Sequence, residues 1–408
     1  MLFKLGFYQF QKNWIMKILV IAQLVFVFVA AIIGSSVYSY HTQYYKYFED
    51  YFSSEGMFLF ADCVYQESGD WMETDMHAFE GRLRNAKVLS MATPGFAVKN
   101  MGRANALFLE CEGEILERYQ PELEEGIWFS RNETEDTVLH LVVSQNDFGW
   151  KTGTELELVT SMGSALKAEV IGVLKEGARI VGIANSKMGY PNDYTNLYAE
   201  VYREESLGPL FILDNRQLSM IYNECGIRSD SVLACQMLIQ YGENITDEDI
   251  RYNESYIEQH VDVSYRYDMK TIRENSINNI KQKLIVFVPI YVAAFVFAII
   301  SVISTTAITV KRQLKNYAIY NVLGLPWRYN AIINATDTGI TVAISIGIAF
   351  VGTALCMGSG CVDNTTIMLD RMQVVVCLIT GIIYIVLAMI IPTVMIRKMT
   401  AKEILNDS

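Results

Sequence analysis

Four long, almost uncharged apolar stretches occur in this 408-residue chain, and a hydrophilic insert separates the first from the other three. They cover residues 18–40, 284–310, 330–357 and 372–396. Each exceeds the roughly 20 helical residues, at about 1.5 Å apiece, that cross a hydrocarbon core roughly 30 Å thick. The sequence therefore predicts a membrane protein with four transmembrane α-helices and a large domain between helices 1 and 2. A signal peptide is the alternative for the first stretch, although its apolar part is long for one.

Charge is divided unevenly along the chain. The insert, residues 41–282, carries 21 basic and 40 acidic side chains, whereas the remainder carries 12 and 5. Lysine and arginine near the membrane cluster before residue 18, within 311–329 and after 396. The positive-inside rule then places the amphipathic segment 1–17, the loop 311–329 and the tail 397–408 in the cytoplasm. The insert and a short loop, 358–371, lie outside, and their acidity argues against nucleic acid as a partner.

The insert is predicted to be an α+β domain. Short β-branched or alternating runs at 138–144, 155–160 and 168–174 are typical of an antiparallel meander, and further strands are expected at 210–213 and 235–241. Thr246 followed by Asp249 predicts a capped helix. A stretch rich in Gly, Pro and Asn at 182–196 is a candidate boundary between two lobes.

Both ends of the insert next to the membrane have helical patterns. Aromatic residues recur at helical spacing after the first span, and isoleucines do so before the second, which predicts two stalk helices. An interfacial aromatic belt is the alternative for the tyrosines. The candidate stalk residues are Tyr40, Tyr44, Tyr47, Tyr51, Ile272, Ile277 and Ile280.

Catalytic and metal-binding motifs are absent from the sequence. It contains no P-loop, no H-E-x-x-H, no C-x-x-C and no G-x-S-x-G, so neither a nucleotide site, nor a catalytic residue, nor a metal or other cofactor is expected. Asp337 is the one charge within a span, and a structural role is favoured over proton relay. Disulfides Cys225/Cys235 or Cys356/Cys361 and free buried thiols remain alternatives.

The segment 311–328, Lys-Arg-Gln-Leu-Lys-Asn-Tyr-Ala-Ile-Tyr-Asn-Val-Leu-Gly-Leu-Pro-Trp-Arg, resembles the one after the second span of MacB/FtsX-type ABC transporter permeases. The runs Glu125-Gly126, Lys151 to Thr154 and Val170 to Leu174, with the tail Ala401 to Leu405, are similar to further parts of that family. Asn316 and Ala318 depart from it, because the family usually has Glu and Gly there.

The resemblance implies a permease subunit that lies in a bacterial cytoplasmic membrane. This subunit would not itself be an enzyme. A separate cytoplasmic ABC ATPase, which binds ATP and Mg, would dock on the loop, and a second permease chain would pair with this one. Closure of the ATPase would move the stalk and the outer domain, for export or extraction of a peptide or hydrophobic substrate. Signalling to an extracytoplasmic enzyme or receptor without transport is the alternative, and an adhesin or sensor without an ATPase is a third. The implied coupling residues are Lys315, Asn316, Tyr320, Leu323, Gly324, Leu325, Pro326, Trp327 and Arg328.

Overall fold

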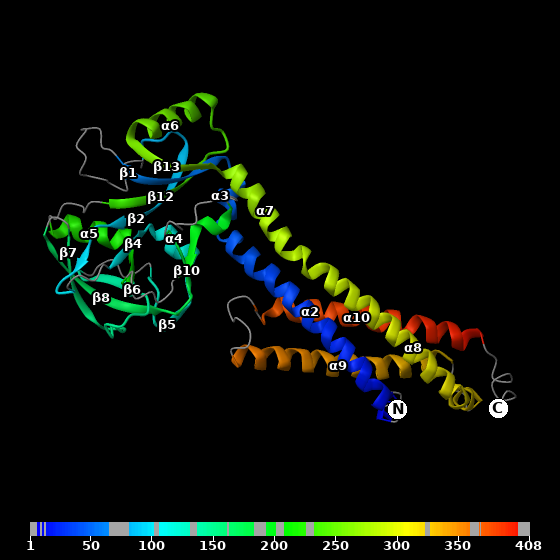
Figure 1. The fold of residues 1–408 in the computed structure, drawn as a ribbon. Coiled ribbons are helices and arrows are strands. Elements are labelled where there is room, and N and C mark those ends of the chain that lie inside the picture. Colours follow the sequence, from blue (N-terminus) through cyan, green and yellow to red (C-terminus); the bar gives the residue numbers. More distant parts are fainter. Residues whose placement is uncertain are drawn as a thin grey trace. The chain divides into compact units, whose positions relative to one another are not determined.

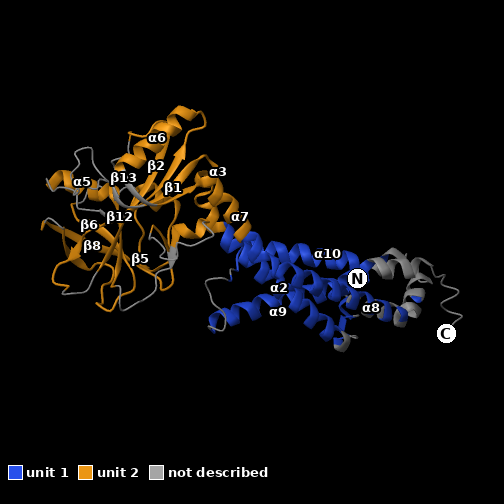
Figure 2. Ribbon diagram, turned by 45° about the horizontal axis from the view of Figure 1, so that its top comes forward, with its two compact units in different colours: residues 1–42, 280–408 blue, residues 43–279 orange. Residues whose placement is uncertain are grey.

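The structure is a computed structural model of the chain, drawn in Figure 1. It divides into two compact units, coloured in Figure 2: unit 1 comprises residues 1–42 and 280–408, and unit 2 comprises residues 43–279. The residues described are 6–8, 10–11, 14–64, 81–101, 106–130, 137–160, 163–182, 193–200, 208–225, 232–322, 327–359, 367 and 369–398.

Unit 1 is a helical bundle. It contains α8 (Phe287–Val322), α9 (Trp327–Gly358), α10 (Arg371–Lys398) and most of α2 (Trp14–Lys46). Four helices of the described chain are long and apolar enough to cross a membrane. Their shared core contains Val20, Leu24, Val27, Phe28, Ala31, Ile32, Ala298, Val342, Ala349, Cys377, Tyr384 and Ala388.

Apolar residues on the bundle surface are consistent with a lipid environment. On α10 the exposed side chains of Val375, Ile379, Ile382 and Val386 follow helical spacing and form one apolar stripe. In water such a stripe would be a contiguous exposed patch, whereas hydrocarbon solvates it. Buried hydroxyls inside the bundle satisfy themselves within their own helix: Thr341 donates to the Asp337 carbonyl at 3.0 Å and Ser345 to the Thr341 carbonyl at 2.8 Å.

The helix expected over 284–310 is interrupted near its start. α7 (Met269–Ile285) ends, Val286 is a turn, and α8 begins at Phe287. Pro289 explains the break, because it has no N–H to donate to the Ile285 carbonyl four residues earlier. At its other end α8 continues to Val322, so the first two thirds of the expected loop 311–329 are helical.

Unit 2 is built on a mixed sheet, seen with its covering helices in Figure 1. Its helices are α3 (Glu49–Ser53), α4 (Gly113–Arg118), α5 (Asn215–Cys225), α6 (Asp247–His260), the start of α7 and the 3-10 turn η2 (Tyr194–Leu197). Its strands are β1 (Gly56–Val64), β2 (Ala86–Pro94), β3 (Ala97–Val98), β4 (Leu107–Cys111), β5 (Leu123–Gly126), β6 (Leu139–Val143), β7 (Glu155–Val159), β8 (Ala165–Leu174), β9 (Arg179–Val181), β10 (Tyr198–Glu200), β11 (Leu210–Asp214), β12 (Val232–Tyr241) and β13 (Val261–Asp268).

Eleven strands form the main sheet, in the order β13-β1-β12-β2-β4-β11-β6-β8-β7-β3 with β5 paired to β8, and β9 and β10 pair separately. The predicted strands are all present, but the prediction that β6, β7 and β8 form an antiparallel meander is wrong. β8 lies between β6 and β7 and runs parallel to β6. The reason is burial: β6 is a buried strand that pairs on both edges, with β11 on one side and β8 on the other.

Two hydrophobic cores pack against this sheet. One core takes residues from the middle of the insert on both sides of residues 182–196, for example Val173 and Phe211. The other joins the two ends of the insert, for example Met57 with Met237 and Ile257. Residues 183–192, most of the predicted lobe boundary, lie outside the described residues, and the division into two lobes stays a prediction.

Local chemistry confirms the capped helix. The Thr246 hydroxyl accepts from the Asp249 amide at 3.2 Å and donates to the Asp249 carboxylate at 2.8 Å, which caps α6. Cys225 and Cys235 are free thiols, so a disulfide between them is also incorrect. Burial raises the pKa of Cys235 to about 12, which keeps this thiol protonated and unreactive.

Candidate functional site

The candidate site is the place in unit 2 where the end of α2 meets the sheet domain. Three of the predicted stalk tyrosines, Tyr44, Tyr47 and Tyr51, lie there. Tyr40 belongs to unit 1, where its ring packs edge-on against His41 at 5.3 Å. We call the aromatic cluster in unit 2 the junction. Its ring contacts join Tyr44, Tyr45, Tyr47, Phe48, Phe52, Tyr119, Tyr194 and Tyr198, and it also includes Tyr51, whose ring centroid lies 5.1 Å from the Arg118 guanidinium.

Edge-to-face ring contacts join the helix end to the domain. The ring centroid of Tyr198 lies 5.0 Å from that of Tyr44 and 5.4 Å from that of Tyr119, and Tyr119 lies 5.1 Å from Tyr47. The guanidinium of Arg179 stands 5.0 Å above the Tyr44 ring. Such pairs each stabilise by about 0.5–1.5 kcal/mol beyond the area they bury. The domain thus holds α2 through several oriented contacts.

Hydrogen bonds fix the same helix end. Near its end α2 tightens, and the Phe48 amide donates to the Tyr45 carbonyl at 3.3 Å, so the Tyr44 carbonyl loses its usual partner four residues on. The Tyr198 hydroxyl donates to this Tyr44 carbonyl at 2.9 Å. Arg118 donates to the carbonyl of Tyr47, the residue that follows α2, at 3.3 Å. Side chains from the domain therefore cap the C-terminus of α2.

The stretch 193–198 also contacts α7. The Tyr194 amide donates to the Ser276 hydroxyl at 2.9 Å, and Asn279 donates to the Asp193 carboxylate. Tyr194 is fully buried and its ring lies 6.3 Å from that of Tyr45. Of the predicted stalk isoleucines, Ile272 is buried, Ile277 and Ile280 are half-buried, and Ile280 belongs to unit 1. Within unit 2, one short segment thus contacts both the end of α2 and α7.

A charged network borders the junction. Arg118 binds Asp50 through two nitrogens at 2.9 and 2.7 Å and Glu114 at 2.7 Å, while Lys87 binds Glu114 at 2.6 Å. Burial alone would raise the pKa of Glu114, but its hydrogen bonds with Lys87 and Arg118 outweigh burial and hold that pKa below its ordinary value. Burial alone would lower the pKa of Arg118. Its hydrogen bonds with Asp50 and Glu114 outweigh burial, so the pKa of Arg118 lies above its ordinary value.

The tyrosines of the junction are held in their protonated form. Burial raises the pKa of Tyr119, of Tyr198 and of Tyr51 well above the ordinary value, so all three keep their protons. Among the residues that the structure describes, no group of three His, Cys, Asp or Glu side chains could hold a metal ion. The junction holds two helix ends in place.

A second contact joins two helices inside unit 1. Lys17 on α2 and Asp337 on α9 form an ion pair at 2.7 Å between side chains that are only 12% and 5% exposed. Nearby, a Cβ atom on Gly6 would come within 2.7 Å of Thr336, so glycine permits this close approach of the N-terminal segment to α9. Asp337 therefore has a counter-ion, which supports its structural interpretation.

The predicted coupling residues are only partly within the described chain. Lys315, Asn316 and Tyr320 lie on the last turns of α8, and Trp327 and Arg328 begin α9. Leu323, Gly324, Leu325 and Pro326 lie outside the described residues. Their role in docking an ATPase stays a prediction.

Sequence reasoning missed the partners of the stalk. Tyr119, Arg179, Tyr194 and Tyr198 are 70 or more positions from Tyr44, and no local pattern marks them. Lys17 was visible only as one of several basic residues before the first span. Only the pairing of distant segments identifies these contacts.

Comparison with known proteins gave similarity at the level of structure. No protein-family model and no curated protein sequence match the chain. The periplasmic region of MacB from Actinobacillus actinomycetemcomitans is similar over 55% of this chain and 93% of its own, at 9% identity and a TM-score of 0.29. The extracellular domain of the noncanonical ABC-type transporter YknZ from Gram-positive bacteria is similar over 51% of this chain and 100% of its own, at 11% identity and a TM-score of 0.28. A domain of a putative permease protein from Porphyromonas gingivalis is similar over 52% of this chain and 85% of its own, at 10% identity and a TM-score of 0.26.

Proposed function

We propose that the chain is the permease subunit of an ABC transporter, driven by a separate cytoplasmic ATPase. ATP-dependent movement reaches the extracytoplasmic unit through α2 and α7 and serves to export or extract a peptide or hydrophobic substrate. The segregation of charge supports an orientation with both termini and the segment 311–329 in the cytoplasm and unit 2 outside. The resemblance of that segment to MacB/FtsX-type permeases supports an ATPase docking site there.

The observation that carries the proposal is the pair of fixed points on α2. This helix of 33 residues, about 50 Å at 1.5 Å per residue, is continuous from Trp14 to Lys46. Near its start Lys17 is paired with α9, the helix that follows the docking segment directly. At its end Tyr198 binds the Tyr44 carbonyl, and Arg118 binds the carbonyl of Tyr47 directly after the helix. We infer that α2, which makes these contacts near both of its ends, carries a displacement of α9 toward unit 2.

Hydrogen exchange with nucleotide tests this transmission. The chain is purified with its cytosolic ATPase, placed in nanodiscs, and exchange is compared with and without ATP for peptides covering 43–53 and 193–200. We expect ATP to change exchange at the junction. Unchanged exchange in an ATPase-active complex would contradict transmission.

A matched variant tests the docking assignment. Charged replacements of Leu323, Gly324 and Trp327 are expected to abolish ATPase pull-down while the chain stays inserted and unit 2 stays folded. Charged replacements of Ile379, Ile382 and Val386 on the exposed stripe of α10 serve as the membrane-facing control, because they impair insertion instead. Pull-down that survives the first set of changes would show that the ATPase docks elsewhere.

A further inference from the structure

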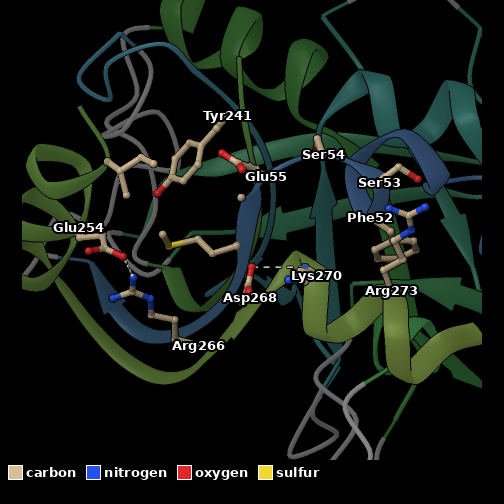
Figure 3. Close-up of a pocket in the computed structure, with 13 residues that line it drawn as sticks. Phe52, Ser53, Ser54, Glu55, Tyr241, Glu254, Arg266, Asp268, Lys270 and Arg273 are labelled. Carbon is tan, nitrogen blue, oxygen red and sulfur yellow. Dashed lines mark hydrogen bonds and ion pairs between the residues drawn. The ribbon is translucent and has the colours of Figure 1, made fainter. Parts of the chain in front are cut away.

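A cavity of about 490 Å³ lies in unit 2 where β1 begins and α7 starts. Figure 3 shows its lining. Apolar side chains of Phe52, Met57, Tyr241 and Ile250 face it together with the serines Ser53 and Ser54. Its charged lining residues are Glu55, Glu254, Arg266, Asp268, Lys270 and Arg273.

Some of these charges already have partners. Arg266 forms ion pairs with Glu254 and, at 3.7 Å, with Glu258. Asp268 accepts from the Lys270 amide at 3.3 Å and so caps the start of α7. These contacts belong to the walls of the cavity.

Three charges remain available to a ligand. Within the described parts of the chain, the side chains of Glu55, Lys270 and Arg273 make no hydrogen bond or ion pair, and all three residues are exposed. Glu55 precedes β1, whereas Lys270 and Arg273 stand one turn apart at the start of α7, where the helix dipole adds positive potential. In Figure 3 Glu55 lies beside Tyr241, apart from Arg273. The cavity therefore offers a carboxylate at one place and two cations at another.

A buried hydroxyl also lacks a partner there. Tyr241 is 7% exposed, and no described residue makes a hydrogen bond with its hydroxyl. Figure 3 shows this hydroxyl on the side of the cavity where Glu254 and Arg266 lie. Burial, and then the nearby Glu254, raise the pKa of Tyr241 to about 12, so at neutral pH it is a donor. Leaving such a group unpaired costs about 1–3 kcal/mol, which a ligand acceptor would recover.

We propose that this cavity binds a short peptide with free termini and apolar side chains. The ammonium group pairs with Glu55, the carboxylate pairs with Lys270 and Arg273, an amide carbonyl accepts from Tyr241, and an apolar side chain covers Met57 and Ile250. The volume of about 490 Å³ lies within the range of roughly 300–1,000 Å³ that is typical of small-molecule sites. The peptide as transported substrate rests on the proposed function, whereas binding itself does not.

Binding to the full chain in nanodiscs, without ATPase or nucleotide, tests the proposal. Calorimetric titrations use Leu-Leu, its N-acetyl form, its C-terminal amide, the doubly capped form and free leucine. We expect Leu-Leu to bind best and each blocked terminus to lower affinity about tenfold, which corresponds to about 1.4 kcal/mol. No saturable binding of Leu-Leu up to about 10 mM, or equal binding of the capped form, would overturn the proposal.

Variants assign the ends of the peptide. The double change Lys270→Glu with Arg273→Glu should weaken Leu-Leu about tenfold or more and should leave the C-terminal amide unaffected. Glu55→Gln should weaken Leu-Leu, whose amino group is free, and should leave the N-acetyl form unaffected. Lys281→Glu on the same helix is the control, because Lys281 is exposed and does not line the cavity. Equal losses for all four peptides in the double variant would overturn the assignment.

Tyr241→Phe separates binding from folding. Removal of an unpaired buried hydroxyl should leave the Tm of the free protein unchanged or raise it, whereas Leu-Leu should bind more weakly. Unchanged binding would remove Tyr241 from the site. Because no ATPase is present, failure of these titrations leaves ATPase docking and transmission intact. Failure of the pull-down leaves the peptide site intact.

Discussion

The Lys17 ammonium and the Asp337 carboxylate lie 2.7 Å apart inside the helical unit, and both side chains are almost completely buried. They join α2 to α9, the helix that directly follows the predicted docking segment. A buried pair is costly to break because the remaining charge is then unpaired in a medium of low dielectric constant. The contact therefore holds α2 and α9 together within unit 1.

Removal of one partner should destabilise unit 1 strongly. Asp337→Leu leaves the Lys17 charge unpaired, and we expect a loss of about 3–5 kcal/mol, measured by unfolding in mild detergent. The double variant Lys17→Met with Asp337→Leu should recover most of this loss. Lys311→Met is the control, because this lysine is exposed. If the double variant were no more stable than Asp337→Leu, the pair would not be the source of the effect.

The Tyr198 hydroxyl should contribute to the attachment of α2. Tyr198→Phe keeps the ring contacts at 5.0 and 5.4 Å but removes the hydrogen bond to the Tyr44 carbonyl. We expect unit 2 to lose about 1–2 kcal/mol of stability and the peptide 43–53 to exchange faster. Tyr222→Phe is a matched control, because this half-buried tyrosine lies on α5, outside the junction. Faster exchange everywhere in unit 2 would indicate general loosening instead.

Elements of the fold followed from local pattern, whereas their pairing did not. β-branched runs predicted β6, β7 and β8, and Thr246 predicted the start of α6. The parallel pairing of β6 with β8 joins two strands that are separated in the chain by β7, and a local window carries no information about such a pairing.

The same reasoning applies to the candidate site. Aromatic spacing located Tyr44, Tyr47 and Tyr51, but Tyr198 reaches them only through the β9–β10 pairing. The break between α7 and α8 was readable from Pro289, because a proline cannot donate to the carbonyl four residues earlier. The coupling residues remain a prediction from resemblance.

The charged network at Arg118 should make unit 2 sensitive to acid. The folded-state pKa of Glu114 lies below its unfolded value of about 4.3, so ionised Glu114 stabilises the fold above that pH. This stabilisation is lost as pH falls through the folded pKa. Glu114→Gln should therefore lower stability at pH 7, by less than about 1 kcal/mol per pair because the groups are partly exposed, and should have little effect at a pH below the folded pKa of Glu114. An equal loss at both pH values, in thermal unfolding scans, would contradict the linkage.

Asn253 should hold α6 onto the sheet domain. Its amide side chain is fully buried, accepts from the Arg84 amide at 2.7 Å and donates to the Arg84 carbonyl at 2.9 Å. Asn253→Ala removes both bonds and leaves two backbone groups unpaired, so we expect a loss of about 2–4 kcal/mol and faster proteolysis near α6. Asn253→Asp keeps an acceptor for the amide but presents a carboxylate to the carbonyl, and it should be as damaging as alanine or worse. A loss below about 1 kcal/mol for Asn253→Ala would show that α6 is held mainly by its apolar face.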